Sequence, residues 1–311
     1  MISRRIIRTK VLQVLYAWVT SPDKSIDQTE KELFFSLQKT YDLYHHMMAT
    51  PVDVADAAVS LMELRKRKHF PTPEDLNPNT RFVQNPLINI LRNHAGLKRY
   101  VEDVKICADW DDTVRKLYKE LTATDFYAAY MSAPELPENG DRKVMEQLMS
   151  EVVLQSDDVN AILEEQSIFW NDDLDFVISM VIKTFKRLLA DPEQPLLPFF
   201  KDDDDEQFAR ILLRKCLFKN EDLKNQVEQL SQNWDVERIA MIDKLIIQMG
   251  IVEMMSFPSI PGKVTINECI ELSKYYSTEK SSIFVNGILD KALKTLESEG
   301  KLEKTGRGLM E

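Results

Sequence analysis

Residues 233–254 read NWDVERIAMIDKLIIQMGIVEM and are followed by SFPSIPGK at 256–263 and VTINECIELSKYYSTEKSSIFVNGILDK at 264–291. In the first segment, apolar residues recur every three or four positions, which predicts one buried face of an α-helix. The prolines and glycine of the second segment should end that helix and turn the chain. The recurring apolar residues are Ile239, Ile242, Leu245, Ile246, Met249 and Val252.

Two further helices are expected after the turn. Thr265 and Glu268 have the spacing of a capping box, and Val264 and Cys269 have that of a hydrophobic staple, so a second helix should begin here. A third helix should begin at about Ser281. Its apolar positions are Phe284, Val285, Ile288, Leu289, Ala292, Leu293 and Leu296.

The whole composition points to an all-α protein. Only 8 of the 311 residues are glycine, and no long stretch alternates apolar and polar residues. No apolar run approaches the ~18 residues that would cross a bilayer, and no signal peptide is recognisable, so a cytoplasmic location is expected. Cys107, Cys216 and Cys269 lie far apart and outside metal-ligand spacing, and they are interpreted as reduced, buried thiols.

The N-terminal segment, residues 3–20, predicts another helix. Ile7, Val11, Val14, Leu15 and Trp18 form its buried stripe. Beside this stripe, three arginines and a tyrosine share one flank, where guanidinium groups could bind phosphates and the phenol could stack on a base. A solvated, purely structural flank is the alternative. The flank residues are Arg4, Arg5, Arg8 and Tyr16.

The C-terminal segment resembles the NusB family of bacterial transcription antitermination factors, and RRIIRTKVLQVLYAW at 4–18 resembles the family's arginine-rich N-terminal motif and first helix. The resemblance implies a NusB-like helical bundle that binds boxA RNA. The residues that carry the C-terminal resemblance are Trp234, Arg238, Asp243, Glu253, Ile266, Asn267, Glu268, Glu271, Leu272, and the run FVNGILDK at 284–291.

A second part of the RNA surface is expected at the start of the third C-terminal helix. Lys280, Ser281 and Phe284 bring a cation, a hydroxyl and an aromatic ring to a helix N-terminus, where free N–H groups can bind phosphate. Ordinary capping, with Phe284 in the core, is the alternative. The resemblance favours the RNA surface, to which Lys10 would add positive charge.

Residues 41–200 are predicted to be a helical, acidic insertion between NusB-like helices at 1–40 and 201–298, with a flexible tail at 299–311. This middle part holds 17 Lys and Arg against 27 Asp and Glu, so it carries nearly all of the net charge of −11. Its first helices are expected at 30–44 and 51–68. The basic run at 65–68 is interpreted as complementing a helix dipole, with RNA contact as the alternative.

No catalytic constellation is recognisable, and the protein is expected not to be an enzyme. The histidines have no partners at metal-ligand spacing, and no glycine-rich phosphate loop is present. The acidic run at 202–205 is interpreted as a solvated helix start rather than a metal site. Neither a metal nor a cofactor is therefore expected. Gly287 is interpreted as the site of a close contact between helices.

The resemblance implies a binding function. The protein would pair with NusE, a small-subunit ribosomal protein, on boxA-like single-stranded RNA in rRNA leaders, and the pair would modify the elongating RNA polymerase complex. A homodimer through the face that NusE would use is left open. The alternative functions are a protein-interaction adaptor without RNA binding and, less favoured, a hydrolase in the insertion.

Overall fold

The computed structural model describes residues 1–21, 23–103, 110–200, 203–231 and 239–309. Every regular element in these ranges is helical, so the all-α prediction is confirmed. Trp234, Arg238 and Cys107 lie outside the described residues. Within the described ranges, no helix combines the length and apolar character needed to cross a membrane.

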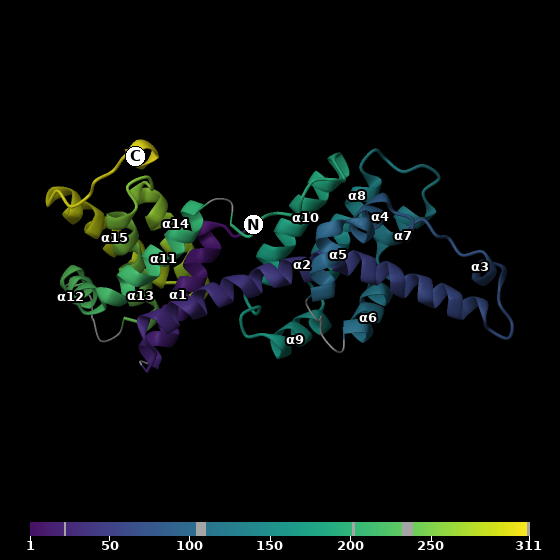
Figure 1. Ribbon diagram of the computed structural model, residues 1–311, viewed down its shortest axis with the longest axis horizontal. Helices are drawn as coiled ribbons and strands as arrows, with labels where there is room; N and C mark the ends of the chain where they lie inside the picture. The colour runs from purple at the N-terminus through teal and green to yellow at the C-terminus, as the bar shows by residue number, and fades with distance from the viewer. Residues whose placement is uncertain (22, 104–109, 201–202, 232–238, 310–311) are drawn as a thin grey trace. The chain divides into compact units, whose positions relative to one another are not determined.

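The chain divides into two compact units. The terminal unit comprises residues 2–37 and 200–311, and the central unit comprises residue 1 and residues 38–199. Helix α2 (Ile26–Lys66) begins in the terminal unit and ends in the central one. Figure 1 shows the N-terminal and C-terminal segments of the terminal unit packed side by side, although they are far apart in sequence.

The terminal unit is a bundle around α13. Helices α1, α11, α12, α14 and α15 all pack against it, and Ile246, Ile251 and Leu289 are completely buried in its core. The predicted helices at 3–20 and from Ser281 are present at the expected places. Besides the start of α2, the helices are α1 (Arg4–Thr20), α11 (Asp203–Phe218), α12 (Asn220–Leu230), α13 (Met241–Ser256), α14 (Gly262–Tyr276), α15 (Ser281–Ser298) and a 3-10 turn, η3 (Gly306–Leu309).

The central unit packs short helices against α10, and hydrogen bonds from Tyr100 to Asp42 and from Trp110 to Asp53 join two further helices to α2 (Figure 1). Tyr44, Met47, Phe82 and Phe185 are completely buried in its core. Besides the end of α2, the elements are α3 (Pro73–Leu76), α4 (Pro86–Asn93), α5 (Ala95–Asp103), α6 (Trp110–Thr122), α7 (Asp125–Ser132), α8 (Gly140–Gln147), the π-helical η1 (Leu148–Val153), α9 (Asp157–Gln166) and α10 (Leu174–Ala190).

The prediction of separate helices at 30–44 and 51–68 is wrong, because α2 runs through Pro51 without ending. A proline inside a helix costs about 3 kcal/mol. Met47, Met48 and Val54 lie on either side of it and are completely buried. Each large apolar side chain contributes about 1.5–3 kcal/mol when buried, so this stripe together outweighs the cost of the proline.

The predicted capping box at Thr265 is also wrong. Helix α14 begins at Gly262 after Pro261, so Thr265 and Glu268 lie inside it. The hydroxyl of Thr265 donates to Glu253 Oε1 at 2.8 Å instead of capping the helix. Val264 is exposed and forms no staple with Cys269. Both polar side chains of the apparent capping box therefore form contacts with other helices.

The interpretation of Gly287 is wrong as well. A Cβ atom placed on Gly287 would meet no atom within 4 Å, whereas one placed on Gly250 would lie 2.8 Å from Leu289 Cδ2 and 3.1 Å from Cys269 Sγ. The close approach of α13 to α14 and α15 is therefore at Gly250. Cys269 and Cys216 are free and buried, as expected.

The described part of the predicted flexible tail contacts the end of α13. Lys304 Nζ donates to the carbonyl oxygens of Met254 at 2.8 Å and Ile260 at 2.7 Å. The N–H of Thr305 donates to Pro258 O at 3.1 Å. Burial lowers the pKa of Lys304, and the charge of Glu253 acts in the opposite direction. These contacts hold residues 304–309 against the terminal unit.

Candidate functional site

Helix α1 carries the predicted arginine motif and packs against α11 and α13. Its Ser3 N-cap makes no side-chain hydrogen bond, and its first turn contains no acid. Arginines at a helix N-terminus oppose the helix dipole. Carboxylates from α11, α13 and α14 surround this end and compensate for the charge. They belong to Asp205, Glu253 and Glu268.

Arg8 lies in the core of the terminal unit, with only 5% of its side chain exposed. Its Nε and Nη2 donate to the two carboxylate oxygens of Glu253, both at 2.7 Å. Nη1 donates to Glu268 Oε2 at 3.4 Å. This bidentate ion pair links α1 to α13. The hydroxyl of Thr265 in α14 also donates a hydrogen bond to the Glu253 carboxylate.

Arg5 lies at the surface, with 61% of its side chain exposed. Its Nη2 and Nε donate to Glu268 at 2.9 Å and 3.1 Å. Arg4 is less exposed; its Nε donates to Asp205 at 3.3 Å, and its Cζ lies 5.1 Å from the centre of the Phe208 ring. Asp205 is buried, so the interpretation of residues 202–205 as a solvated helix start is wrong at this position.

The ion pairs set the protonation states of this cluster. Burial by itself would lower the pKa of Arg8, but hydrogen bonds and the charge of Glu253 raise it above its usual value. The hydrogen bonds that Arg5 donates to Glu268, and the charge of that carboxylate, raise the pKa of Arg5. Burial would raise the pKa of Glu268, yet Arg5 and Arg8 together lower it. These shifts favour the charged forms of Arg5, Arg8 and Glu268.

The second half of the predicted site lies where α14 ends and α15 begins. Gln13 Nε2 of α1 donates to the hydroxyl of Tyr276 at 3.1 Å, which joins α1 to this end of α14. Tyr16, one turn beyond Gln13, is 44% exposed, and Tyr275 and Lys280 are also exposed. Arg5 and Gln13 are eight residues apart, so the contact of Arg5 with Glu268 and that of Gln13 with Tyr276 lie about 12 Å apart along α1.

The predicted site residues thus separate into two groups. Arg5, Tyr16 and Lys280 are exposed, and Arg4 is partly exposed. Arg8, Lys10, Ser281 and Phe284 are buried. The Ser281 hydroxyl hydrogen-bonds with those of Ser277 and Thr278, both at 2.9 Å. The exposed group lies on α1 and just before α15, and the buried group packs inside the terminal unit.

Sequence reasoning did not assign Asp205, Glu268 or the Tyr275–Tyr276 pair to this site. The two adjacent tyrosines, with ring centres 5.0 Å apart, follow the last apolar position of an amphipathic helix. That placement was a usable signal for a surface aromatic pair. Glu268 belongs to the family pattern, but its spacing from Thr265 predicts a helix cap. Its pairing with Arg5 depends on how α1 packs against α14, which local spacing does not reveal.

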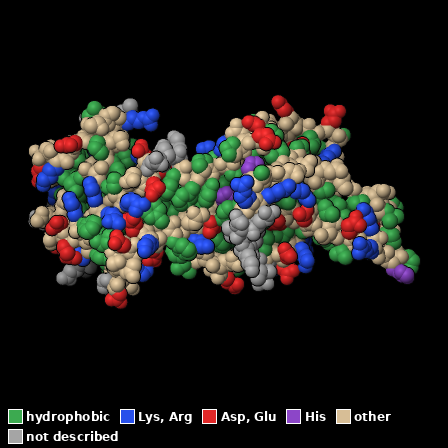
Figure 2. Space-filling model, viewed as in Figure 1, with side chains coloured by type: hydrophobic (Ala, Val, Ile, Leu, Met, Phe, Trp, Pro, Cys, Tyr) green, Lys and Arg blue, Asp and Glu red, His purple; other side chains and the backbone are tan. Residues whose placement is uncertain are grey.

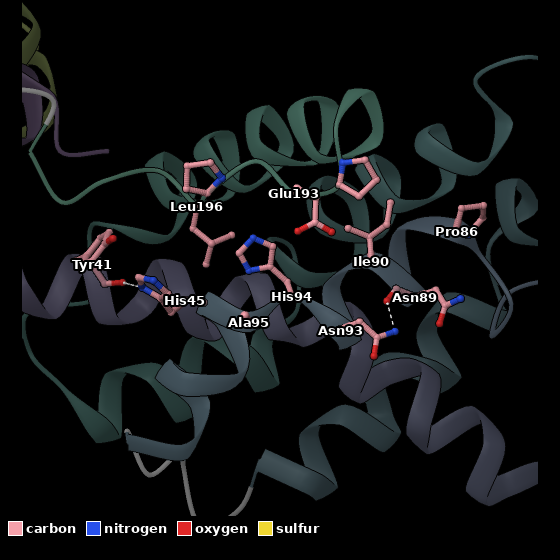
Figure 3. A pocket seen from close by; sticks show the side chains of 13 residues that line it. Tyr41, His45, Pro86, Asn89, Ile90, Asn93, His94, Ala95, Glu193 and Leu196 are labelled. Atoms are coloured by element: carbon pink, nitrogen blue, oxygen red, sulfur yellow. Dashed lines mark hydrogen bonds between the residues drawn. The ribbon is translucent and has the colours of Figure 1, made fainter.

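The central unit contains a separate hollow of about 850 Å³ between α4 and the segment that follows α10 (Figure 3). His45 and His94 line it, together with the exposed amides of Asn89 and Asn93. His45 Nδ1 hydrogen-bonds with Tyr41 O at 2.9 Å, and burial lowers the pKa of its ring. His94 Nε2 hydrogen-bonds with Gln194 O at 3.0 Å. The histidines therefore have structural partners.

No group of three or more potential metal ligands is found among the residues that the structure describes. Comparison with protein families matches the chain to the NusB family over residues 179–294, which include α11–α14 and most of α15. The transcription antitermination protein NusB of Salinibacter ruber is 39% identical over 126 residues, which are 39% of this chain and 79% of that protein. The chain belongs to the NusB family.

Two other NusB proteins support this membership. The transcription antitermination protein NusB of Chloroherpeton thalassium is 45% identical over 106 residues, or 34% of this chain and 50% of that protein. That of Myxococcus xanthus is 40% identical over 91 residues, or 29% of this chain and 65% of that protein. No solved structure matches the chain. Lys280, Ser281, Glu253 and Glu268 lie within the NusB match, whereas the arginines of α1 lie before it.

Proposed function

We propose that this NusB-family protein is an RNA-binding transcription antitermination factor. It binds boxA-like single-stranded RNA of rRNA leaders together with the ribosomal protein NusE, and the complex joins the elongating RNA polymerase. The observation that carries the proposal is the exposure of Arg5, Tyr16 and Lys280 on the terminal unit, which offers cations and an aromatic ring. The antitermination proteins to which the chain is similar support it.

The proposal assigns arginines to RNA according to the free energy that breaking each ion pair would cost. An exposed ion pair contributes at most about 1 kcal/mol, so Arg5 can exchange Glu268 for a phosphate at little cost. Breaking a buried pair costs about 3–5 kcal/mol, which keeps Arg8 on Glu253. In the proposal, Arg5, Lys280 and the exposed part of Arg4 bind phosphates, and Tyr16 contacts a base or NusE. Arg8, Lys10, Ser281 and Phe284 support this surface from within.

Fluorescence anisotropy tests the proposal. A boxA-containing leader RNA is titrated with the full-length protein, alone and with NusE, at several salt concentrations. The variant Arg5→Ala/Lys280→Ala should weaken binding and reduce the salt slope by about 1.4, since each phosphate contact contributes about 0.7 on single-stranded RNA. The control Lys294→Ala/Lys301→Ala removes two exposed cations elsewhere in the same unit and should not change binding.

A protein-interaction adaptor without RNA binding is the second candidate. The observation that favours it is that Arg4, Arg5 and Arg8 each pair with a carboxylate of the same unit, which reduces the positive potential of α1. Absence of salt-dependent RNA binding, with and without NusE, would support the adaptor and contradict the RNA-binding proposal. A solution measurement of mass would test for a homodimer through the face proposed for NusE.

A further inference from the structure

The end of α2 in the central unit is an exposed basic and aromatic surface, here called the α2 tip (residues 64–70, LRKRKHF). Helix α2 ends at Lys66, so Arg67 and Lys68 lie beyond the helix. Phe70 is 85% exposed, and its ring centre lies 4.8 Å from that of His69. Figure 2 shows basic, apolar and histidine side chains near one another at this end of α2.

The helix dipole explains only part of the α2 tip. Arg65 and Lys66 in the last turn complement the dipole, but Arg67 lies outside the helix, and no dipole effect requires an exposed Phe70. Lys66 pairs with Glu63 at 2.8 Å and Lys68 with Asp75 at 3.0 Å. Among the described residues, neither Arg65 nor Arg67 forms an ion pair.

A hollow of about 300 Å³ lies beside the α2 tip, and Arg65 is on its edge. The hollow is lined by Tyr118 and Tyr127, and by the carboxylates of Glu74 and Asp75. The two tyrosine rings are buried and Asp75 is paired with Lys68, whereas the exposed carboxylate of Glu74 can accept a hydrogen bond from the amino group of a base. The α2 tip therefore combines two unpaired guanidinium groups, an exposed ring and an adjoining recess.

We propose that the α2 tip is a second binding site for single-stranded RNA, with Arg65 and Arg67 on phosphates and Phe70 stacked on a base. Proteins that bind single strands combine positive charge along the backbone with aromatic rings that stack on bases. Arginine suits this role because its planar guanidinium group can donate two hydrogen bonds to the oxygens of one phosphate. The residues belong to the central unit, so the site does not depend on the function proposed for α1.

RNA suits this surface better than a membrane does. Membrane-surface segments present an extended apolar face of a helix, whereas the α2 tip has only Leu64 and Phe70 as exposed apolar side chains. The central unit is otherwise strongly acidic, with a balance of −10 over residues 41–200, so an anionic ligand can be accepted only where the cations gather. A single strand can contact this small patch without approaching the acidic surface around it.

The test is anisotropy with the full-length protein and a labelled single-stranded RNA of about 12 nucleotides. The variant Phe70→Ala should weaken binding by about 5- to 150-fold, the range for loss of one stacked base. Arg65→Gln/Arg67→Gln should reduce the salt slope by about 1.4. Matched controls are Ile168→Ala, which truncates another exposed apolar residue of the unit, and Arg115→Gln/Lys186→Gln, which removes two exposed cations.

The α2 tip variants are also combined with Arg5→Ala/Lys280→Ala. Loss of affinity from the α2 tip changes in both backgrounds would support the second site, even if the α1 changes had no effect and the function proposed above failed. Tip variants that bind RNA as tightly as their controls would overturn it. So would weaker binding to phosphatidylserine vesicles with unchanged RNA affinity. Circular dichroism of each variant verifies that its helical content is retained.

Discussion

Substitution of Glu253 by glutamine should destabilise the terminal unit strongly. Glu253 and Arg8 have 2% and 5% of their side chains exposed, and two hydrogen bonds of 2.7 Å join them. Glutamine retains the shape, but it turns an N–H donor toward the guanidinium group and removes the negative charge. An uncompensated buried charge costs about 3–5 kcal/mol, a large share of the ~5–15 kcal/mol that stabilises a typical domain.

Urea denaturation followed by circular dichroism measures the loss, and hydrogen exchange of α1 and α13 locates it in the terminal unit. The variant Lys294→Ala, which breaks an exposed pair with Asp290, should leave the unfolding free energy unchanged and serves as the control. A loss below about 1 kcal/mol in Glu253→Gln would refute the conclusion that this pair joins the two helices.

A double substitution separates the ion pair from the packing. Arg8→Met/Glu253→Met removes both charges and keeps most of the buried volume, so its unfolding free energy should be close to that of the unsubstituted protein or higher. Each methionine alone should be markedly less stable than the double variant, because it leaves one buried charge without a partner. Equal losses in the single and double variants would show that packing, not charge pairing, dominates at this position.

Gly250→Ala should lose about 1–3 kcal/mol, because the new Cβ would lie 2.8 Å from Leu289. Gly287→Ala should gain about 0.5–1 kcal/mol in the exposed part of a helix, and thermal unfolding compares the two. Asp53, whose pKa burial raises from 3.8 to about 6, should make the central unit lose stability as pH rises through that range, because the folded state holds the proton more tightly. Asp53→Asn should remove this slope in melting temperatures measured across the same range; an unchanged slope would exclude Asp53 as its cause.

Periodicity predicted that the terminal unit is helical, and the spaced apolar residues Val285, Ile288 and Leu289 of α15 are buried as expected. The prediction of one buried face is wrong for α13, which is buried at every position from Leu245 to Met254 because five helices pack around it. Periodicity did not predict that α2 continues through Pro51. That outcome depends on burial against helices distant in sequence, and a proline signal gives no information about it.

The site was predicted less completely, because its residues are arranged by contacts between helices. Helical spacing places the arginines of α1 on one flank, but the structure buries Arg8 and exposes Arg5. Whether each faces solvent or a carboxylate depends on α13 and α14, which follow more than 200 residues later in the chain. The sequence also could not show that the close contact between helices lies at Gly250 and not at Gly287. Both glycines are within helices, and only the neighbouring helix distinguishes a crowded position from an open one.

The burial of Arg8 has a consequence for genetic screens of this protein. Under the function proposed above, a screen for loss of antitermination would recover substitutions of Arg4, Arg5 and Arg8 together and invite the conclusion that all three touch RNA. Arg8 variants would lower the amount of folded protein, so their defect should worsen on warming and diminish at low temperature or with higher expression. Arg5 variants should accumulate normally and show the same defect at every temperature. Cellular abundance therefore separates the two causes before any binding is measured.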